Sequence, residues 1–172
     1  SQIKGLFKWS NFEAPDLSFD GTANLATSEF LSWVGIQTWE ESSGSASGSI
    51  GFRQHYANLD ELGSNGVWGG MWSGTLAFSP GQWRPQGNKI PLEVRGGEVQ
   101  LDGQDLNLKN WSIVLGRSDA VINGTVRNAL NDLGMAHDLQ IRSKQLNASE
   151  LMDSEVWNGL WTGPTNPEDP DF

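Results

Sequence analysis

The chain has 172 residues, no cysteine and a formal net charge of −10 at pH 7. This charge argues against binding to nucleic acid or to an anionic membrane surface, and the lack of cysteine excludes disulfides and thiolate metal sites. With 37% hydrophobic residues, 21 glycines and 9 tryptophans, the chain is too apolar for a disordered protein and too polar for a membrane-spanning helix.

The N-terminal half is predicted to form strands around one short helix. Apolar and polar residues alternate over 3–9 and again over 17–25, which is typical of strands. Thr27, Ser28 and Glu29 provide a hydroxyl N-cap and an acid in the first turn, so a helix is predicted over 28–34. We then expect a polar loop over 40–48, followed by two further strands over 49–56 and 67–78.

The C-terminal half is predicted to be a series of hairpins after a turn region over 79–87. The expected strands cover residues 90–95, 98–101, 106–115, 120–126 and 137–143. Gly96-Gly97 and Asp102-Gly103 are typical hairpin-turn dipeptides. The apolar positions change parity between Leu108 and Trp111, which predicts a β-bulge near Asn110. A turn or short helix over 128–134 and a short helix from Ser149 complete the pattern.

These elements define a mainly β, antiparallel meander of hairpins with one or two short helices. Residues 1–157 are expected to form one β unit. Residues 158–172 are acidic and rich in proline, so we expect a linker or tail there.

The segment LGRSDAVINGTV, residues 115–126, allows two interpretations. It could be a catalytic loop around Asp119, or the tight turn of a hairpin. Apolar residues flank both sides of Gly116–Asp119, and Gly and Asp suit turns because one tolerates positive φ and the other bonds back to the backbone. The turn interpretation is therefore favoured, with Asp119 in a structural role.

Two segments of the chain echo each other. DLSFDGTANLATSEFL (16–31) and DLQIRSKQLNASELM (138–152) share the spacing Leu-x-x-Ser-Glu-apolar-apolar, as expected of a repeated strand–helix unit. The run LDGQDLNLKNWSIVLGRSDAVINGTVRN followed by LQIRSKQLNASELM resembles the AsmA-like family of bacterial envelope proteins, bridge-like lipid transfer proteins. The resemblance extends over most of 3–152 and is most specific over 105–152. The number of tryptophans and the segment 40–48 depart from it.

This resemblance implies a curved, repeat-like β groove between the inner and outer membranes, in a parent protein that is anchored in the inner membrane. It further implies a non-enzymatic role in phospholipid transport or outer-membrane assembly, in the periplasm or cell envelope, without a cofactor. The expected partners are phospholipid acyl chains and neighbouring β units of the parent chain. As an isolated fragment, the unit can form a homodimer that covers its apolar surface.

The best candidate for a lipid-binding site is a stripe on the predicted strand 67–78. With a period of two, one face carries Trp68, Gly70, Trp72, Gly74, Leu76 and Phe78. The large residues Trp68, Trp72, Leu76 and Phe78 could line a groove for acyl chains. The same residues could equally form a closed core under the helix 28–34, because both roles need the same residue types.

The remaining tryptophans support a different function. Exposed rings on a β-sandwich would stack on sugars, so a carbohydrate-binding module is the alternative; the candidates are Trp33, Trp39, Trp83, Trp111, Trp157 and Trp161. The acid pairs Glu40-Glu41 and Asp60-Glu61 raise the question of a glycosidase. No partner for either pair is identifiable, so no catalytic residue is assigned. His55 and His137 are too few for a multi-histidine metal site, and none is predicted.

Overall fold

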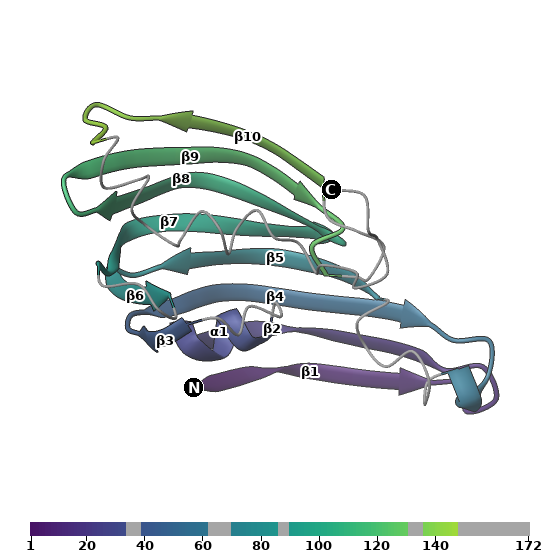
Figure 1. The fold of residues 1–172 in the computed structure, drawn as a ribbon. Helices are drawn as coiled ribbons and strands as arrows, with labels where there is room; N and C mark the ends of the chain where they lie inside the picture. The colour runs from purple at the N-terminus through teal and green to yellow at the C-terminus, as the bar shows by residue number, and fades with distance from the viewer. Residues whose placement is uncertain (34–38, 62–69, 86–89, 131–135, 148–172) are drawn as a thin grey trace, which may run out of the picture.

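The computed structural model describes residues 1–33, 39–61, 70–85, 90–130 and 136–147, and these residues form one ten-stranded antiparallel sheet (Figure 1). The strands, in chain order, are β1 (Gln2–Ser10), β2 (Asp16–Ala26), β3 (Trp39–Ser42), β4 (Ser45–His55), β5 (Met71–Phe78), β6 (Gly81–Pro85), β7 (Leu92–Gly103), β8 (Asp105–Leu115), β9 (Ser118–Arg127) and β10 (Ala136–Arg142). The helix α1 (Thr27–Trp33) follows β2 directly, and a helical turn begins at Leu59.

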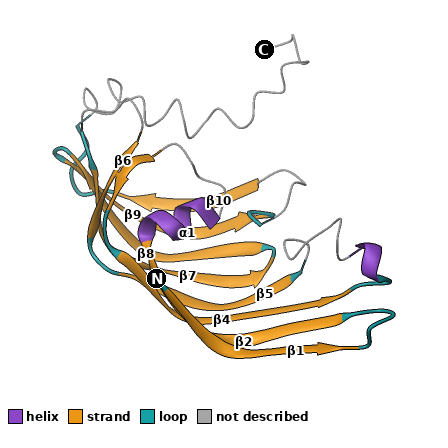
Figure 2. Ribbon diagram, turned by 90° about the horizontal axis from the view of Figure 1, so that it is seen from below, coloured by secondary structure: helices purple, strands orange, loops and turns teal. Residues whose placement is uncertain are grey.

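The long strands follow one another across the sheet in the order β1-β2-β4-β5-β7-β8-β9-β10, while the short β3 and β6 pair with each other and β6 also pairs with β7. Each pair is antiparallel. Figure 2 shows the sheet bent into an arc with α1 on its inner side. The predicted antiparallel, curved meander with short helices is thus confirmed.

The strands form as their alternation predicts. In β2, Leu17, Ala23 and Leu25 are buried while the intervening residues are half-buried or exposed. Apolar burial on one face and solvation on the other is the usual condition of an antiparallel strand. The strands predicted over 3–9, 17–25, 106–115, 120–126 and 137–143 are each found within two residues of these bounds.

The bulge expected near Asn110 is also found. The β8–β9 register shifts between Leu108 and Trp111. Asn110 has a φ of +51°, in the left-handed region that asparagine tolerates better than most residues. Its backbone N–H donates to Asn123 Oδ1 across the strands at 2.8 Å, which satisfies a group that the bulge would leave unpaired.

Two segments that were predicted to be connections contain strands instead. The segment 40–48, expected to be a polar loop, contains most of β3 and the start of β4, and the region 79–87 contains β6. Serine and glycine are poor strand formers, but tertiary pairing overrides propensity here. Ser43 and Gln82 show this, since Ser43 N donates to Gln82 O at 2.8 Å.

The predicted hairpin turn at Gly96-Gly97 is also wrong. Leu92–Gly103 is one continuous strand, β7, with register shifts on both sides of Gly96. Gly96 has φ of +136°, and a Cβ at Gly97 would lie 2.8 Å from the Trp111 ring. The two glycines therefore form a bulge that lets the tryptophan pack against the backbone. The predicted turn at Asp102-Gly103 does close the β7–β8 hairpin, with φ of +66° at Gly103.

The predicted helix from Ser149 and the tail 158–172 lie outside the described residues, as does most of 128–134. The similar segments 16–31 and 138–152 both begin with a strand, β2 and β10 respectively. The counterparts then differ: Leu25 is in β2, whereas Leu146 follows the end of β10.

Candidate functional site

One face of the sheet is apolar from edge to edge. Residues paired directly across antiparallel strands point to the same face. Starting at Phe7, the register links Phe7 to Phe19 and Phe19 to Phe52, and Phe52 to Trp72. The same face carries Leu17, Ala23, Leu25, Ala46, Ile50, Leu76, Phe78, Val99, Leu101, Leu106, Leu108, Trp111, Ile113, Ile122 and Val126. We call this surface the apolar face.

The opposite face is polar and is held by cross-strand pairs. Lys109 Nζ lies 3.7 Å from Glu98 Oε1 on neighbouring strands, and Thr125 Oγ1 donates to Asn107 Oδ1 at 2.6 Å. Since these pairs are exposed or half-buried, each contributes little to stability. The two faces therefore differ in chemistry along the whole sheet.

An aromatic cluster closes the apolar face at the end where α1, β3 and β6 lie. Phe78 is its centre: its ring centroid lies 4.8 Å from that of Phe30 on α1 and 4.8 Å from that of Trp111 on β8. Trp83 on β6 packs against Trp111 at 5.5 Å, with the rings edge to face. All four side chains are buried, so α1 and β6 cover this part of the sheet.

The predicted stripe lies in this core. Trp72, Leu76 and Phe78 are 9%, 0% and 6% exposed, and Trp68 lies outside the described residues. Phe78 is covered by α1, as the closed-core interpretation predicts, and Trp72 contacts Phe52 at a centroid distance of 5.0 Å. The glycine of the stripe at position 70 also serves packing, because a Cβ there would overlap the Phe52 ring.

The apolar face is exposed at the two lateral edges of the sheet. On β1, Ile3, Phe7 and Trp9 are 55%, 56% and 43% exposed. On β10, Leu139 and Ile141 are 39% and 54% exposed and belong to the same face, since they pair with Gly124 and Ile122. Sequence reasoning identified β1 and β10 as strands but not as exposed ends of the face. Their alternation is the same as that of buried strands, so no sequence signal separates them.

Trp9 and Phe12 form an exposed aromatic pair at one corner of the sheet. Their rings stack with centroids 5.7 Å apart, and Phe12 is 74% exposed. A depression at this corner lies on the polar face of the sheet, where the register places Lys8, Asp16, Arg53 and His55. Trp9 and the cationic side chains Lys8 and Arg53 therefore lie on opposite faces of the sheet, and Arg53 Nη2 lies 4.0 Å from Asp20 Oδ2.

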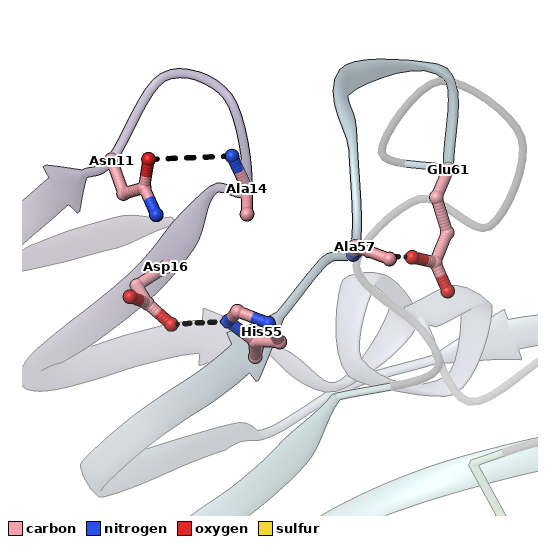
Figure 3. A network of polar contacts seen from close by, with 6 residues as sticks. All are labelled: Asn11, Ala14, Asp16, His55, Ala57 and Glu61. Atoms are coloured by element: carbon pink, nitrogen blue, oxygen red, sulfur yellow. Dashed lines mark hydrogen bonds and ion pairs between the residues drawn. The ribbon is translucent and has the colours of Figure 1, made fainter.

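Polar contacts fix the turns around this corner (Figure 3). His55 Nδ1 lies 2.7 Å from Asp16 Oδ1 on the neighbouring strand, and Asn11 Oδ1 accepts a hydrogen bond from Ala14 N at 3.4 Å. Glu61 accepts from Ala57 N at 2.6 Å. His55 is thus exposed and paired, and Glu61 caps a local turn, so neither contact resembles a paired-carboxylate hydrolase site.

The remaining candidate groups do not converge. In the part of the chain that the structure describes, no three His, Asp or Glu side chains are placed to hold a metal ion. Asp60 is exposed, and the side chains of Glu40 and Glu41 lie outside the described residues, as do those of Trp33, Trp39, Trp157 and Trp161. Of the tryptophans proposed to stack on sugars, Trp83 and Trp111 are buried.

Asp119 has the structural role that the turn interpretation predicts. The turn is Gly116-Arg117, shorter than predicted, and Ser118 and Asp119 already belong to β9. Asp119 Oδ1 accepts hydrogen bonds from Lys144 N at 2.8 Å and Gln145 N at 2.9 Å, and Ser143 Oγ lies 3.2 Å away. These bonds, led by that from Gln145, lower the pKa of Asp119. The carboxylate therefore holds the segment that follows β10.

No family model, no curated protein and no solved structure matches this chain. Among the helices of the described residues, none is long and apolar enough to cross a membrane.

Proposed function

We propose that this chain is a β segment of an AsmA-like protein of the bacterial cell envelope, and that its apolar face takes up phospholipid acyl chains. The observation that carries the proposal is the continuity of that face. It runs in register from β1 to β10 and is exposed at both lateral edges. The parts of this face that are exposed at the two lateral edges are typical of an interaction site.

The physical basis of the proposed lipid binding is the burial of apolar surface, and no chemical reaction is involved. An acyl chain laid along β1 would cover Ile3, Phe7 and Trp9, and such contact stabilises by about 25 cal/mol per Å² of apolar area removed from water. Trp72, Leu76 and Phe78 remain proposed lining residues. Because they are buried, they would be reached only if the elements that cover them move.

The outer edge of β1 suggests a second partner in addition to lipid. Within the described residues β1 pairs with β2 alone, so its outer backbone groups are available to another strand. We assign this edge to a neighbouring β unit of the parent protein in the periplasm. The same apolar face would then continue into the next unit, with no cofactor and no catalytic residue.

Phe7 and Leu6 allow a matched test. The two residues are adjacent on β1 and are 56% and 59% exposed, but they point to opposite faces. The purified chain is mixed with phosphatidylcholine vesicles that contain NBD-labelled phosphatidylethanolamine, and lipid transfer to the protein is followed on native gels. Phe7→Glu should reduce the bound lipid several-fold, whereas Leu6→Glu should leave it within twofold of wild type. Equal binding by all three proteins, or no binding by wild type, would contradict the proposal.

A carbohydrate-binding module remains the second candidate, and the stacked, exposed pair Trp9–Phe12 favours it. Two rings at a surface corner can stack on a sugar chain. Titration with a soluble β-glucan, followed by tryptophan fluorescence, distinguishes the two. A saturable change that is lost in Phe12→Ala, in a chain that binds no lipid, would select the sugar-binding role.

A further inference from the structure

The outer edge of β10 differs from the outer edge of β1 in its charges. Both strands are exposed, and each pairs on one side only among the described strands. On the polar face, β1 carries Lys4 and Lys8, whereas β10 carries Asp138 and Arg142 at positions i and i+4. Lysines along an edge strand oppose pairing of that edge with the same edge of a second copy. A pair of opposite charges on an edge strand does not.

We propose that β10 pairs with β10 of a second copy of this chain, antiparallel about a twofold axis at Gln140. In this register Asp138 lies opposite Arg142 of the second copy, and Arg142 lies opposite its Asp138. On the apolar face, Leu139 lies opposite Ile141 in both directions. A direct cross-strand pair of opposite charges and a pair of apolar side chains each favour an antiparallel register.

Neighbouring registers are less favourable. An axis at Leu139 places Asp138 opposite Gln140 and Arg142 opposite Ala136, which leaves both charges without a counter-charge. An axis at Ile141 places Leu139 opposite Ser143 and Asp138 opposite Lys144, but both partners lie beyond the end of β10. Sliding one strand past the other by an odd number of residues would place apolar side chains of one copy on the polar face of the other. Within β10, Ala136–Arg142, the register about Gln140 alone pairs both charges with each other and both apolar side chains with each other.

The same operation on β1 is unfavourable. When β1 pairs with itself over its full length, Gln2 to Ser10, the axis falls at Leu6, and Lys4 then lies opposite Lys8 of the second copy. Like charges directly opposite each other are destabilising in a sheet. The edge that dimerises is therefore β10, and the free edge of β1 is left to another partner.

The dimer would extend the apolar face across the axis. Leu139 and Ile141, 39% and 54% exposed in the single chain, would be covered by each other across the two copies. Pairing of two short strands gives an interface at the small end of the specific range. We therefore expect a weak dimer whose population depends on concentration and that forms with or without lipid.

Charge exchange tests the register. Sedimentation velocity of the whole chain from about 10 µM to about 1 mM should show a concentration-dependent dimer. Asp138→Arg and Arg142→Asp should each raise its Kd at least tenfold, and the double variant should return it to within threefold of wild type. Lys4→Asp with Lys8→Asp is the control and should not raise the Kd. Loss of dimer in the double variant, or a monomer at all concentrations, would overturn the proposal.

A cysteine provides a second, independent test, because the chain has none. Residues at the axis of an antiparallel pair lie close enough for a disulfide. Gln140→Cys should therefore form a covalent dimer under mild oxidation, while Leu6→Cys should stay monomeric. Cross-linking at Leu6 and not at Gln140 would place the interface at β1 and overturn the assignment. Lipid binding by a chain that does not dimerise would overturn this inference and leave the proposed function standing.

Discussion

The strands β5 and β1 carry the same alternation but lie in different environments. On the apolar face, Leu76 and Phe78 of β5 are 0% and 6% exposed, while Ile3 and Phe7 of β1 are 55% and 56% exposed. β5 has neighbours on both sides and an aromatic cluster above it, whereas β1 pairs with β2 alone among the described strands. The difference shows that position in the sheet, and not the residue pattern, separates a buried strand from an exposed one.

The largest effect should come from the centre of the aromatic cluster. Phe78→Ala removes the ring that contacts Phe30, Trp83 and Trp111. We expect the free energy of unfolding to fall by about 3–5 kcal/mol, the usual cost of removing a buried phenylalanine side chain. Urea denaturation followed by tryptophan fluorescence measures it. A loss below about 1 kcal/mol would mean that β5 is no more essential to the core than an edge strand.

The bulge in β7 should give the next effect. A Cβ at Gly97 would lie 2.8 Å from the Trp111 ring and 2.9 Å from its backbone Cα. The backbone atom cannot move aside easily, so we expect Gly97→Ala to destabilise the chain by about 1–3 kcal/mol. Equilibrium unfolding measures it. Tolerance of the alanine would show that Trp111 does not depend on the close approach of this glycine.

A smaller effect with a defined pH dependence is expected at Asp119. Its pKa in the folded chain is lowered, chiefly by the hydrogen bonds from Gln145 and Lys144. A lowered folded pKa gives stability that is present above the unfolded pKa and lost as pH falls through the folded pKa. The stability difference between wild type and Asp119→Asn should therefore be constant near neutral pH and shrink as pH falls below about 4. Denaturation between pH 2 and 7 tests this, and an unchanged difference at low pH would contradict it.

The smallest effect is expected on the exposed strand. Phe7→Ala should change the free energy of unfolding by less than about 0.5–1 kcal/mol, because the ring is already half in water. The same denaturation assay gives the value beside that of Phe78→Ala. A loss as large as that of Phe78→Ala would show that β1 is covered in solution, and would remove it as a lipid-contacting edge.

Much of the fold could be predicted from short-range patterns. Alternation located β1, β2, β8, β9 and β10, because side chains in a strand alternate between faces whatever the partner strand is. The change of parity before Trp111 located a bulge for the same reason. A structural role for Asp119 also followed from residue type, but Asp119 lies in β9 and not in the turn, and its hydrogen-bond partners, 25 and 26 residues along the chain, could not be named.

Other features needed the tertiary structure. The pairing of β3 with β6 includes Ser42 and Pro85, whose propensities indicate loops, and it exists because backbone groups from distant segments meet. Gly96-Gly97 has the residues of a hairpin turn but forms a bulge, since Trp111 packs there. Above all, the sequence by itself determined that one face of each strand is apolar, through its period of two. Only the order of strands in the sheet decided which part of that face is core and which part meets solvent, because exposure depends on the number of neighbours a strand acquires.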